Sequence, residues 1–305
     1  MTPPQKPSSL CSNTLWSNTL GWWLVAPVLL GLILFTWLPT VASLGLSFTH
    51  WDMLGAPQWV GLHQYQTLLM DPLFAKVMTQ TLWFVVLVTV FELILGLGLA
   101  LWLHQQATRS AKWIQWLSFT PVVAPLVSVA LVWGWIYDPA TGLLNQLLQW
   151  VGALNWLNGG QPMVWLYDER TALGALVALH VWKHVGYTVI LFLAGLQAIP
   201  DSVLEAAKLD GASGLKALSK ITLPLLWPTV VFVVTVTLIN TCQTFDSVYL
   251  LTRGGPNNAT TLWVFWLVKL AFEQFNIGAA AALGVLLFVL LAGLGLSQKH
   301  FQNSN

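Results

Sequence analysis

The sequence predicts an all-α integral membrane protein with six transmembrane helices. Of its 305 residues, 56% are hydrophobic and only 8% are charged, which leaves too few polar side chains to cover a water-soluble globule. Six apolar runs are each long enough to cross about 30 Å of hydrocarbon as a helix. Helices rather than isolated strands are expected there, because the bilayer offers no water to unpaired backbone groups.

The expected spans are residues 22–48, 77–103, 113–136, 172–198, 225–250 and 277–297. They form one transmembrane domain, 22–297, between a polar N-terminal tail (1–21) and a C-terminal tail (298–305). The first apolar run is longer than the core of a signal peptide, so we expect it to be retained. No soluble domain is expected, because the longest polar stretches are too short to build a separate core.

Lysine and arginine set the expected orientation. The tails and the 104–112 and 199–222 loops carry more of them than the opposite loops: Lys6, Arg109, Lys112, Lys208, Lys216, Lys220 and Lys299 against Lys76, Arg170 and Arg253. The positive-inside rule therefore places both termini in the cytoplasm. Two long outer loops follow, and in the second we expect Trp263–Phe275 to form a short helix lying at the membrane interface.

Several function classes are disfavoured by charge and spacing. A net charge of +1, with scattered lysines and arginines, gives no footprint for nucleic acid. Cys11 and Cys242 fall at different membrane depths, so no disulfide is expected. The chain has no G-x-x-x-x-G-K-[ST] phosphate loop, and it shows no recognisable set of nucleophile, base and orienting group. We therefore expect a protein that is not an enzyme.

A metal site is not expected from the sequence either. His180 and His184 have the spacing of a metal-binding pair, but Val181 stands where a zinc enzyme of the H-E-x-x-H type has its glutamate. Glu92, in the second span, is expected to bond to a neighbouring helix.

The loop between the fourth and fifth spans contains residues that typically begin and end short helices. Pro200-Asp201 opens a short helix, Ser202 to Glu205 reads as a capping box, and Asp210-Gly211 breaks the helix. A second short helix then runs to Pro224, which suits the first turn of the fifth span. We expect a rigid hairpin of two short helices over 199–224.

Within this loop, Glu205-Ala206-Ala207, Gly211 and Ile221-Thr222-Leu223-Pro224 resemble the EAA signature of ABC importer permeases in residue type and spacing. The resemblance implies a type I ABC importer permease fold, in which 199–224 is a coupling loop that docks on a separate ATPase. The implied docking residues are Glu205, Ala206, Ala207, Asp210, Gly211 and Ala212. The alternative is that Glu205 merely caps its own helix and Gly211 merely ends it.

Further stretches resemble the carbohydrate branch of that family, the maltose and glycerol-phosphate permeases. They are Thr120-Pro121, Trp133-Gly134-Trp135, 138–145, 193–200, Phe245-Asp246 and 251–256 followed by Ala259-Thr260. The resemblance implies a sugar or sugar-like osmolyte as cargo, such as trehalose or glucosylglycerol, and a place in the bacterial inner membrane. It also implies a second permease subunit, usually forming a heterodimer, two ATP-binding subunits and an extracytoplasmic solute-binding protein. This chain would bind no cofactor, while ATP and Mg²⁺ would be used by the partner ATPase.

Polar residues at membrane depth are expensive, so they should face a cavity or a partner helix. Two groups at helical spacing, one on the fourth span and one on the fifth, lie at matching depth and carry hydroxyl, amide and aromatic groups suited to a polyol. The expected substrate pathway is Trp182, Lys183, His184, Tyr187, Thr237, Asn240, Thr241, Gln243, Thr244, Asp246 and Ser247.

Two alternatives stay open at this point. In the first alternative, the hydroxyls and amides form hydrogen bonds that hold the helices together, and Lys183 and Asp246 form a structural ion pair. In the second alternative, the protein is an ion-coupled secondary transporter, and Glu92, Lys183 and Asp246 are its proton or ion sites. Such a transporter has no use for a coupling loop.

Overall fold

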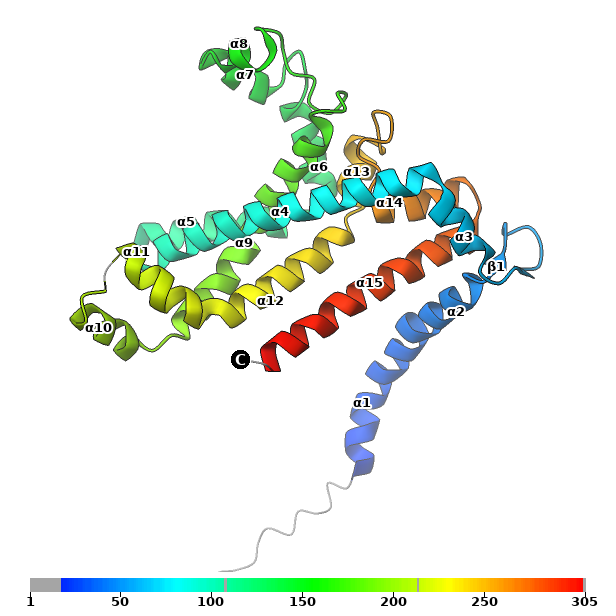
Figure 1. The fold of residues 1–305 in the computed structure, drawn as a ribbon, viewed down its shortest axis with the longest axis horizontal. Helices are drawn as coiled ribbons and strands as arrows, with labels where there is room; N and C mark the ends of the chain where they lie inside the picture. Colours follow the sequence, from blue (N-terminus) through cyan, green and yellow to red (C-terminus); the bar gives the residue numbers. More distant parts are fainter. Residues whose placement is uncertain (1–17, 107–108, 213, 304–305) are drawn as a thin grey trace, which may run out of the picture.

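The computed structural model describes residues 18–106, 109–212 and 214–303, and helices make up most of that part of the chain (Figure 1). The tail residues 1–17 and 304–305 lie outside it. The long helices are α1 (Asn18–Leu32), α2 (Leu38–Leu46), α4 (Pro72–His104), α5 (Arg109–Val123), α6 (Leu126–Ile136), α9 (Ala172–Gln197), α12 (Leu223–Cys242) and α15 (Ile277–Asn303).

Shorter elements connect these helices. They are η1 (Ile33–Trp37), α3 (His63–Met70), α7 (Leu143–Trp150), α8 (Ala153–Asn158), α10 (Asp201–Leu209), α11 (Gly214–Ala217), η2 (Leu218–Thr222), α13 (Asp246–Leu251), α14 (Trp263–Val268) and η3 (Lys269–Glu273), where η marks a π-helical turn. Strands β1 (Thr49–His50) and β2 (Gln58–Trp59) form an antiparallel hairpin, in which Thr49 pairs with Trp59.

Five of the predicted spans are present as helices, and the sixth is present when a bent pair of helices is counted as one broken span. Five helical segments are long and apolar enough to cross a bilayer: Trp22–Leu46, Pro72–His104, Ala172–Gln197, Gly214–Cys242 and Ile277–Gln298. The sixth span is the pair α5 and α6, which is bent by 101° at its break. Pro125 is the N-cap of α6, and it has no N–H with which to continue the α5 hydrogen-bond ladder. The expectation of a continuous third span over 113–136 is therefore wrong.

The order of the crossings places the two predicted inner loops and the two ends of the described chain on one side. Successive spans alternate in direction, so the start of α1, the connection from α4 to α5, helix α10 and the end of α15 share a side. Figure 1 shows α10 and the end of α15 away from β1, α3 and α13, which lie at the opposite end of the bundle. That the α10 side is the cytoplasm stays a prediction from the charge bias.

Helices α4, α9 and α12 form the centre of the bundle, with α5 packed on α9. On α9, Val189 and Phe192 are buried against Leu226 and Val233 of α12 and Ala100 of α4. Between membrane helices such close packing takes the place of the hydrophobic effect, because lipid tails are as apolar as leucine. The centre therefore depends on how nearly the helix backbones can approach one another.

Glycines allow that approach at two crossings. A Cβ on Gly96 of α4 would lie 2.5 Å from Cγ2 of Thr188 on α9, and a Cβ on Gly186 of α9 would lie 2.0 Å from the backbone oxygen of Ser118 on α5. Gly98, by contrast, has nothing within 4 Å of its added Cβ in the described part of the chain. Close contact at helix crossings thus explains Gly96 and Gly186.

The segment after the fifth span is buried rather than interfacial. Trp263 and Trp266 of α14 are 4% and 1% exposed and pack with Leu283 of α15 in a common core. The Trp263 backbone N–H donates to Oγ1 of Thr81 at 3.1 Å, and its indole N–H donates to the Leu283 carbonyl at 3.1 Å. The expectation of a helix lying at the membrane interface over Trp263–Phe275 is therefore wrong: helix α14 is present, but both of its indoles are inside the core.

The loop after α6 is organised by polar side chains. Asp138 accepts hydrogen bonds from the N–H and the hydroxyl of Thr141, at 2.7 and 2.9 Å, and from the N–H of Ala140. The bond from the Thr141 N–H is the main cause that lowers the pKa of Asp138. Asn145 then ties α7 to the returning chain, donating to the Met163 carbonyl at 2.9 Å and accepting from its N–H. The loop therefore has an ordered base where it leaves the end of α6.

Candidate functional site

The predicted coupling loop is a pair of short helical segments, as expected. Helix α10 starts at Asp201, and after the turn α11 and η2 lead into α12. Ser202 is the second residue of α10 rather than the residue before it, so the capping box expected from Ser202 to Glu205 is not formed. The N–H of Val203 donates instead to the Pro200 carbonyl at 3.1 Å.

The end of α10 depends on Gly211. This residue has φ of +77°, in the left-handed region that side chains other than glycine adopt at a cost. The N–H of Ala212 donates to the Ala207 carbonyl at 2.9 Å, and the N–H of Asp210 donates to the Ala206 carbonyl at 3.0 Å. The bond from Ala212 to Ala207 is that of a Schellman motif, which satisfies a carbonyl that the helix end would leave unpaired. Gly211 therefore provides the turn expected of it.

The six predicted docking residues divide between two faces of the loop. Glu205, Ala206, Asp210 and Gly211 are exposed, whereas Ala207 and Ala212 are buried at 6% and 9% exposure. Two leucines that the sequence reading passed over, Leu209 and Leu215, are 90% and 82% exposed. Helix α10 thus presents the small Ala206 and the apolar Leu209 outside the spans, while Leu215 lies at the start of the segment Gly214–Cys242.

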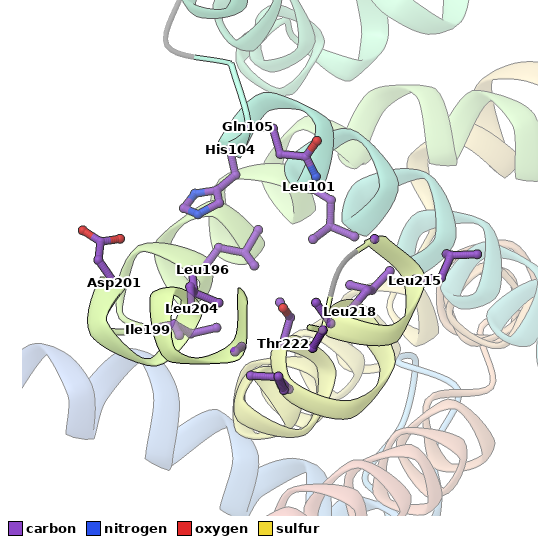
Figure 2. A pocket seen from close by; sticks show the side chains of 15 residues that line it. Leu101, His104, Gln105, Leu196, Ile199, Asp201, Leu204, Leu215, Leu218 and Thr222 are labelled. Carbon is purple, nitrogen blue, oxygen red and sulfur yellow. The ribbon is translucent and has the colours of Figure 1, made fainter. Parts of the chain in front are cut away.

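A cavity of about 900 Å³ separates the loop from the helices behind it (Figure 2). The end of α4 contributes Leu101, His104 and Gln105 to its wall, and Leu204 and Leu218 face it from the loop. Because most of the lining is apolar, the cavity does not resemble a polyol site.

On α9 the predicted pathway residues point in different directions. Trp182 and Tyr187 are 44% and 39% exposed, and the Trp182 ring lies edge-on to Trp133 with centroids 5.5 Å apart. His184 is half-buried. The two aromatic residues are therefore open to whatever covers this face of the chain.

Lys183 is buried and holds the broken span. Its ammonium donates to the carbonyls of Ala124, Pro121 and Val122, at 2.8, 3.1 and 3.4 Å. These are carbonyls that α5 leaves without intrahelical partners where it ends, and a cation there also interacts favourably with the helix dipole. The ion pair of Lys183 with Asp246 is absent from the described residues, so Lys183 has a structural task in this conformation.

The pathway residues from 237 to 247 do not share one helix face. Helix α12 ends at Cys242, and Asp246 and Ser247 belong to α13, so the expectation of a continuous span over 225–250 is wrong. In place of one face there are two sets: Asn240, Gln243 and Asp246 are exposed, while Thr237, Thr241, Thr244 and Ser247 are buried.

The buried hydroxyls of Thr241, Thr244 and Ser247 have no hydrogen-bond partner within the described chain. They line the break between α12 and α13, where the ladder of backbone bonds is interrupted. The assignment of these residues to the substrate pathway stays a prediction.

Comparison with known proteins identifies the fold and the family. Residues 92–304 match the family described as binding-protein-dependent transport system inner membrane component. The chain is 33% identical over 277 residues to the trehalose/maltose transport system permease protein of Thermococcus litoralis, covering 89% of this chain and 90% of the relative. It is 32% identical over 291 residues to the sn-glycerol-3-phosphate transport system permease protein of Agrobacterium fabrum, covering 93% and 95%.

Among solved structures, a chain of a bacterial ABC transporter involved in the import of the acidic polysaccharide alginate superposes with a TM-score of 0.79 at 22% identity, covering 95% of this chain and 98% of that one. At that identity the likeness concerns the fold alone. The family match, which spans more than half of the chain, confirms the resemblance seen in the sequence. The chain therefore belongs to the family of binding-protein-dependent transport system inner membrane components, as a non-catalytic permease subunit of the inner membrane.

Proposed function

We propose that this permease subunit passes a sugar or sugar-like osmolyte into the cytoplasm and is driven through the loop 199–224 by a separate ATPase. The observation that carries the proposal is the uncovered apolar surface of that loop. Leu209 of α10 is almost fully exposed outside the spans, Leu215 is exposed at the start of the segment Gly214–Cys242, and Ala206 of α10 is small enough for a partner to approach closely.

An exposed leucine outside the hydrocarbon, such as Leu209, has no lipid to cover it, so a protein partner is the natural occupant. Two ATP-binding subunits, one for each permease, would use ATP and Mg²⁺, and this chain would bind neither. The cavity behind the loop supports a mechanical role, because it leaves room into which the loop can shift when the ATPase closes. This reading places the α10 side of the bundle, and both termini, in the cytoplasm.

The exposed polar residues in the spans support a pathway completed by a second permease subunit. Asn240, Gln243 and Tyr187 are open on this chain alone, although amide and phenol groups facing lipid would be costly. A second subunit placed over them would remove them from lipid and enclose a polar route. Their amide and hydroxyl groups, with Trp182 as an aromatic face, suit a neutral polyol.

The names of the relatives support a carbohydrate as cargo. Trehalose/maltose and sn-glycerol-3-phosphate are the cargoes that two relatives are named for, and the alginate transporter was also solved with a substrate-bound periplasmic protein. We infer that this chain likewise receives its cargo from an extracytoplasmic binding protein. Within the carbohydrates, we favour a neutral glycoside over a phosphorylated one, because Lys183 is already engaged by three carbonyls.

The test is uptake by the importer reconstituted in proteoliposomes with its binding protein, second permease and ATP-binding subunits. Uptake of a labelled glycoside should require ATP on the side of the membrane where the ATP-binding subunits are bound. It should persist when an uncoupler is added. Collapse with the uncoupler, together with activity in the absence of ATP, would establish an ion-coupled carrier instead.

A panel of glycosides would then define the cargo by stimulation of ATP hydrolysis. Asn240→Ala and Tyr187→Ala should each weaken uptake while the complex still assembles. A strong response to phosphorylated or amino-acid ligands alone, or unchanged uptake in both variants, would overturn the proposed cargo and pathway.

A further inference from the structure

We propose that Glu92, His180 and His184 form a binding site for one divalent transition-metal ion, of the kind that zinc represents, inside the bundle. One carboxylate oxygen and one ring nitrogen from each histidine all lie within 4.8 Å of one another. The sequence pattern offers no glutamate at position 181, but the fold brings one from α4. The site therefore joins α4 to α9.

Glu92 supplies an oxygen that nothing else uses. The residue is 3% exposed, and its Oε1 has no hydrogen-bond partner among the described residues. That oxygen lies 4.0 Å from Nε2 of His180, while Oε2 accepts a hydrogen bond from the Thr188 hydroxyl at 3.4 Å. The hydroxyl thus orients the carboxylate and leaves Oε1 directed at the histidines. A buried carboxylate oxygen without a partner is costly, so its presence calls for a ligand.

His184 is held in the tautomer that a metal ligand needs. Its Nδ1 lies 3.0 Å from the His180 carbonyl oxygen, which can only accept, so Nδ1 must carry the hydrogen. The lone pair on Nε2 is then free. Histidines that bind metals commonly donate their other ring N–H to a carbonyl or carboxylate in this way. The two rings lie together, with centroids 4.2 Å apart, and Phe84 packs edge-on against His180.

Two imidazoles and one carboxylate are a common ligand set for zinc with a fourth position open. Bonds of about 2.0–2.2 Å would bring the ligand atoms to roughly 3.4 Å apart, so the three side chains must each close slightly around the ion. His184 is half-buried, so one ligand of the site lies at the surface of this chain, one helical turn from the exposed Tyr187. The charge of nearby Lys183 opposes binding, but three carbonyls already surround its ammonium.

The experiment uses the full chain, purified in detergent, stripped with a chelator and titrated with Co²⁺, whose visible absorption reports four-coordinate binding. Wild type should bind one Co²⁺ per chain, displaced by Zn²⁺. Glu92→Gln and His184→Gln should abolish the signal, whereas His63→Asn, which changes an exposed histidine on α3, should keep it. Thr188→Val leaves the ligands intact but removes the orienting bond, and it should weaken affinity by about 10–100-fold.

His184→Cys keeps the proposal falsifiable if the buried glutamate variant misfolds. A thiolate in that position should retain Co²⁺ and add the intense sulfur-to-cobalt charge-transfer band. Absence of saturable Co²⁺ binding by wild type would overturn the site, and Glu92 with His180 would then be a buried polar pair only. Binding by Glu92→Gln and His184→Gln equal to that of His63→Asn would overturn it as well.

Discussion

Gly186→Ala should separate the broken span from α9. The added Cβ would lie 2.0 Å from the Ser118 carbonyl oxygen and 2.6 Å from its carbon, and both belong to backbone that cannot rotate away. The helices must therefore move apart by about 1 Å to reach the shortest distance that Cβ atoms tolerate. Overpacking of this kind costs about 1–3 kcal/mol, and the gain from alanine in a helix returns at most about 1 kcal/mol. Because the contact at 2.0 Å is with backbone, the upper end of the overpacking cost applies, and subtracting the alanine gain leaves a net loss of about 2 kcal/mol.

Gly174→Ala is the matched control on the same helix. Nothing in the described chain lies within 4 Å of its added Cβ, so this variant should be neutral or gain up to about 1 kcal/mol. The assay is unfolding of the full chain in detergent, followed by tryptophan fluorescence. Gly186→Ala should unfold at clearly milder conditions than wild type and Gly174→Ala at the same or harsher ones. Equal stability of the two variants would refute the reasoning that α5 and α9 touch through their backbones at Gly186.

Two further predictions concern the broken span and the loop. Lys183→Met removes the donor from the carbonyls of Pro121 and Val122 in α5 and of Ala124 just after it, so it should lower the unfolding temperature by the equivalent of about 2–3 kcal/mol. A variant with normal stability but lost cargo-stimulated ATP hydrolysis would favour a cargo role instead. Gly211→Val should weaken cargo-stimulated ATP hydrolysis, because a β-branched residue at φ of +77° costs about 1–2 kcal/mol. Gly211→Asn should largely retain this activity, because asparagine adopts the left-handed region more readily. Equal activity of the two variants would contradict the requirement for a left-handed turn.

The number and position of the spans could be predicted because the bilayer dictates them. A segment that crosses hydrocarbon must be apolar over a fixed length and must satisfy its own backbone bonds, so hydropathy alone locates it. The short helices of the 199–224 loop were also predictable, since Pro200 and Gly211 mark their ends.

Two predicted spans are broken, one between α5 and α6 and the other between α12 and α13, and only the first break has a signal in the sequence. Pro125 was a visible signal for the break between α5 and α6, because a proline lacks the donor that the ladder needs. The end of α12 at Cys242 carries no proline or glycine, so no residue in the sequence marks it. Helical spacing across that break therefore predicted a shared face that does not exist.

Contacts between segments that are distant in the chain could not be predicted from the sequence. Lys183 was read as a pathway residue or as a partner of Asp246, because nothing local shows that the open end of α5 lies beside it. The meeting of Glu92 with His180 likewise depends on how α4 crosses α9, which is set by packing at Gly96 and Thr188. Local spacing reports which residues share a helix face, and only the fold reports what that face meets.

The most direct test of the account is whether the exposed face of the loop holds the ATPase. Affinity-tagged chain carrying Ala206→Arg or Ala206→Ser would be purified from membranes that also contain the other importer subunits. Ala206 is exposed, so arginine there should leave the permease folded and inserted while blocking close approach of a partner. The account predicts that Ala206→Arg loses the ATP-binding subunits and uptake, whereas Ala206→Ser keeps both. Recovery of the ATP-binding subunits and full uptake with Ala206→Arg would contradict it.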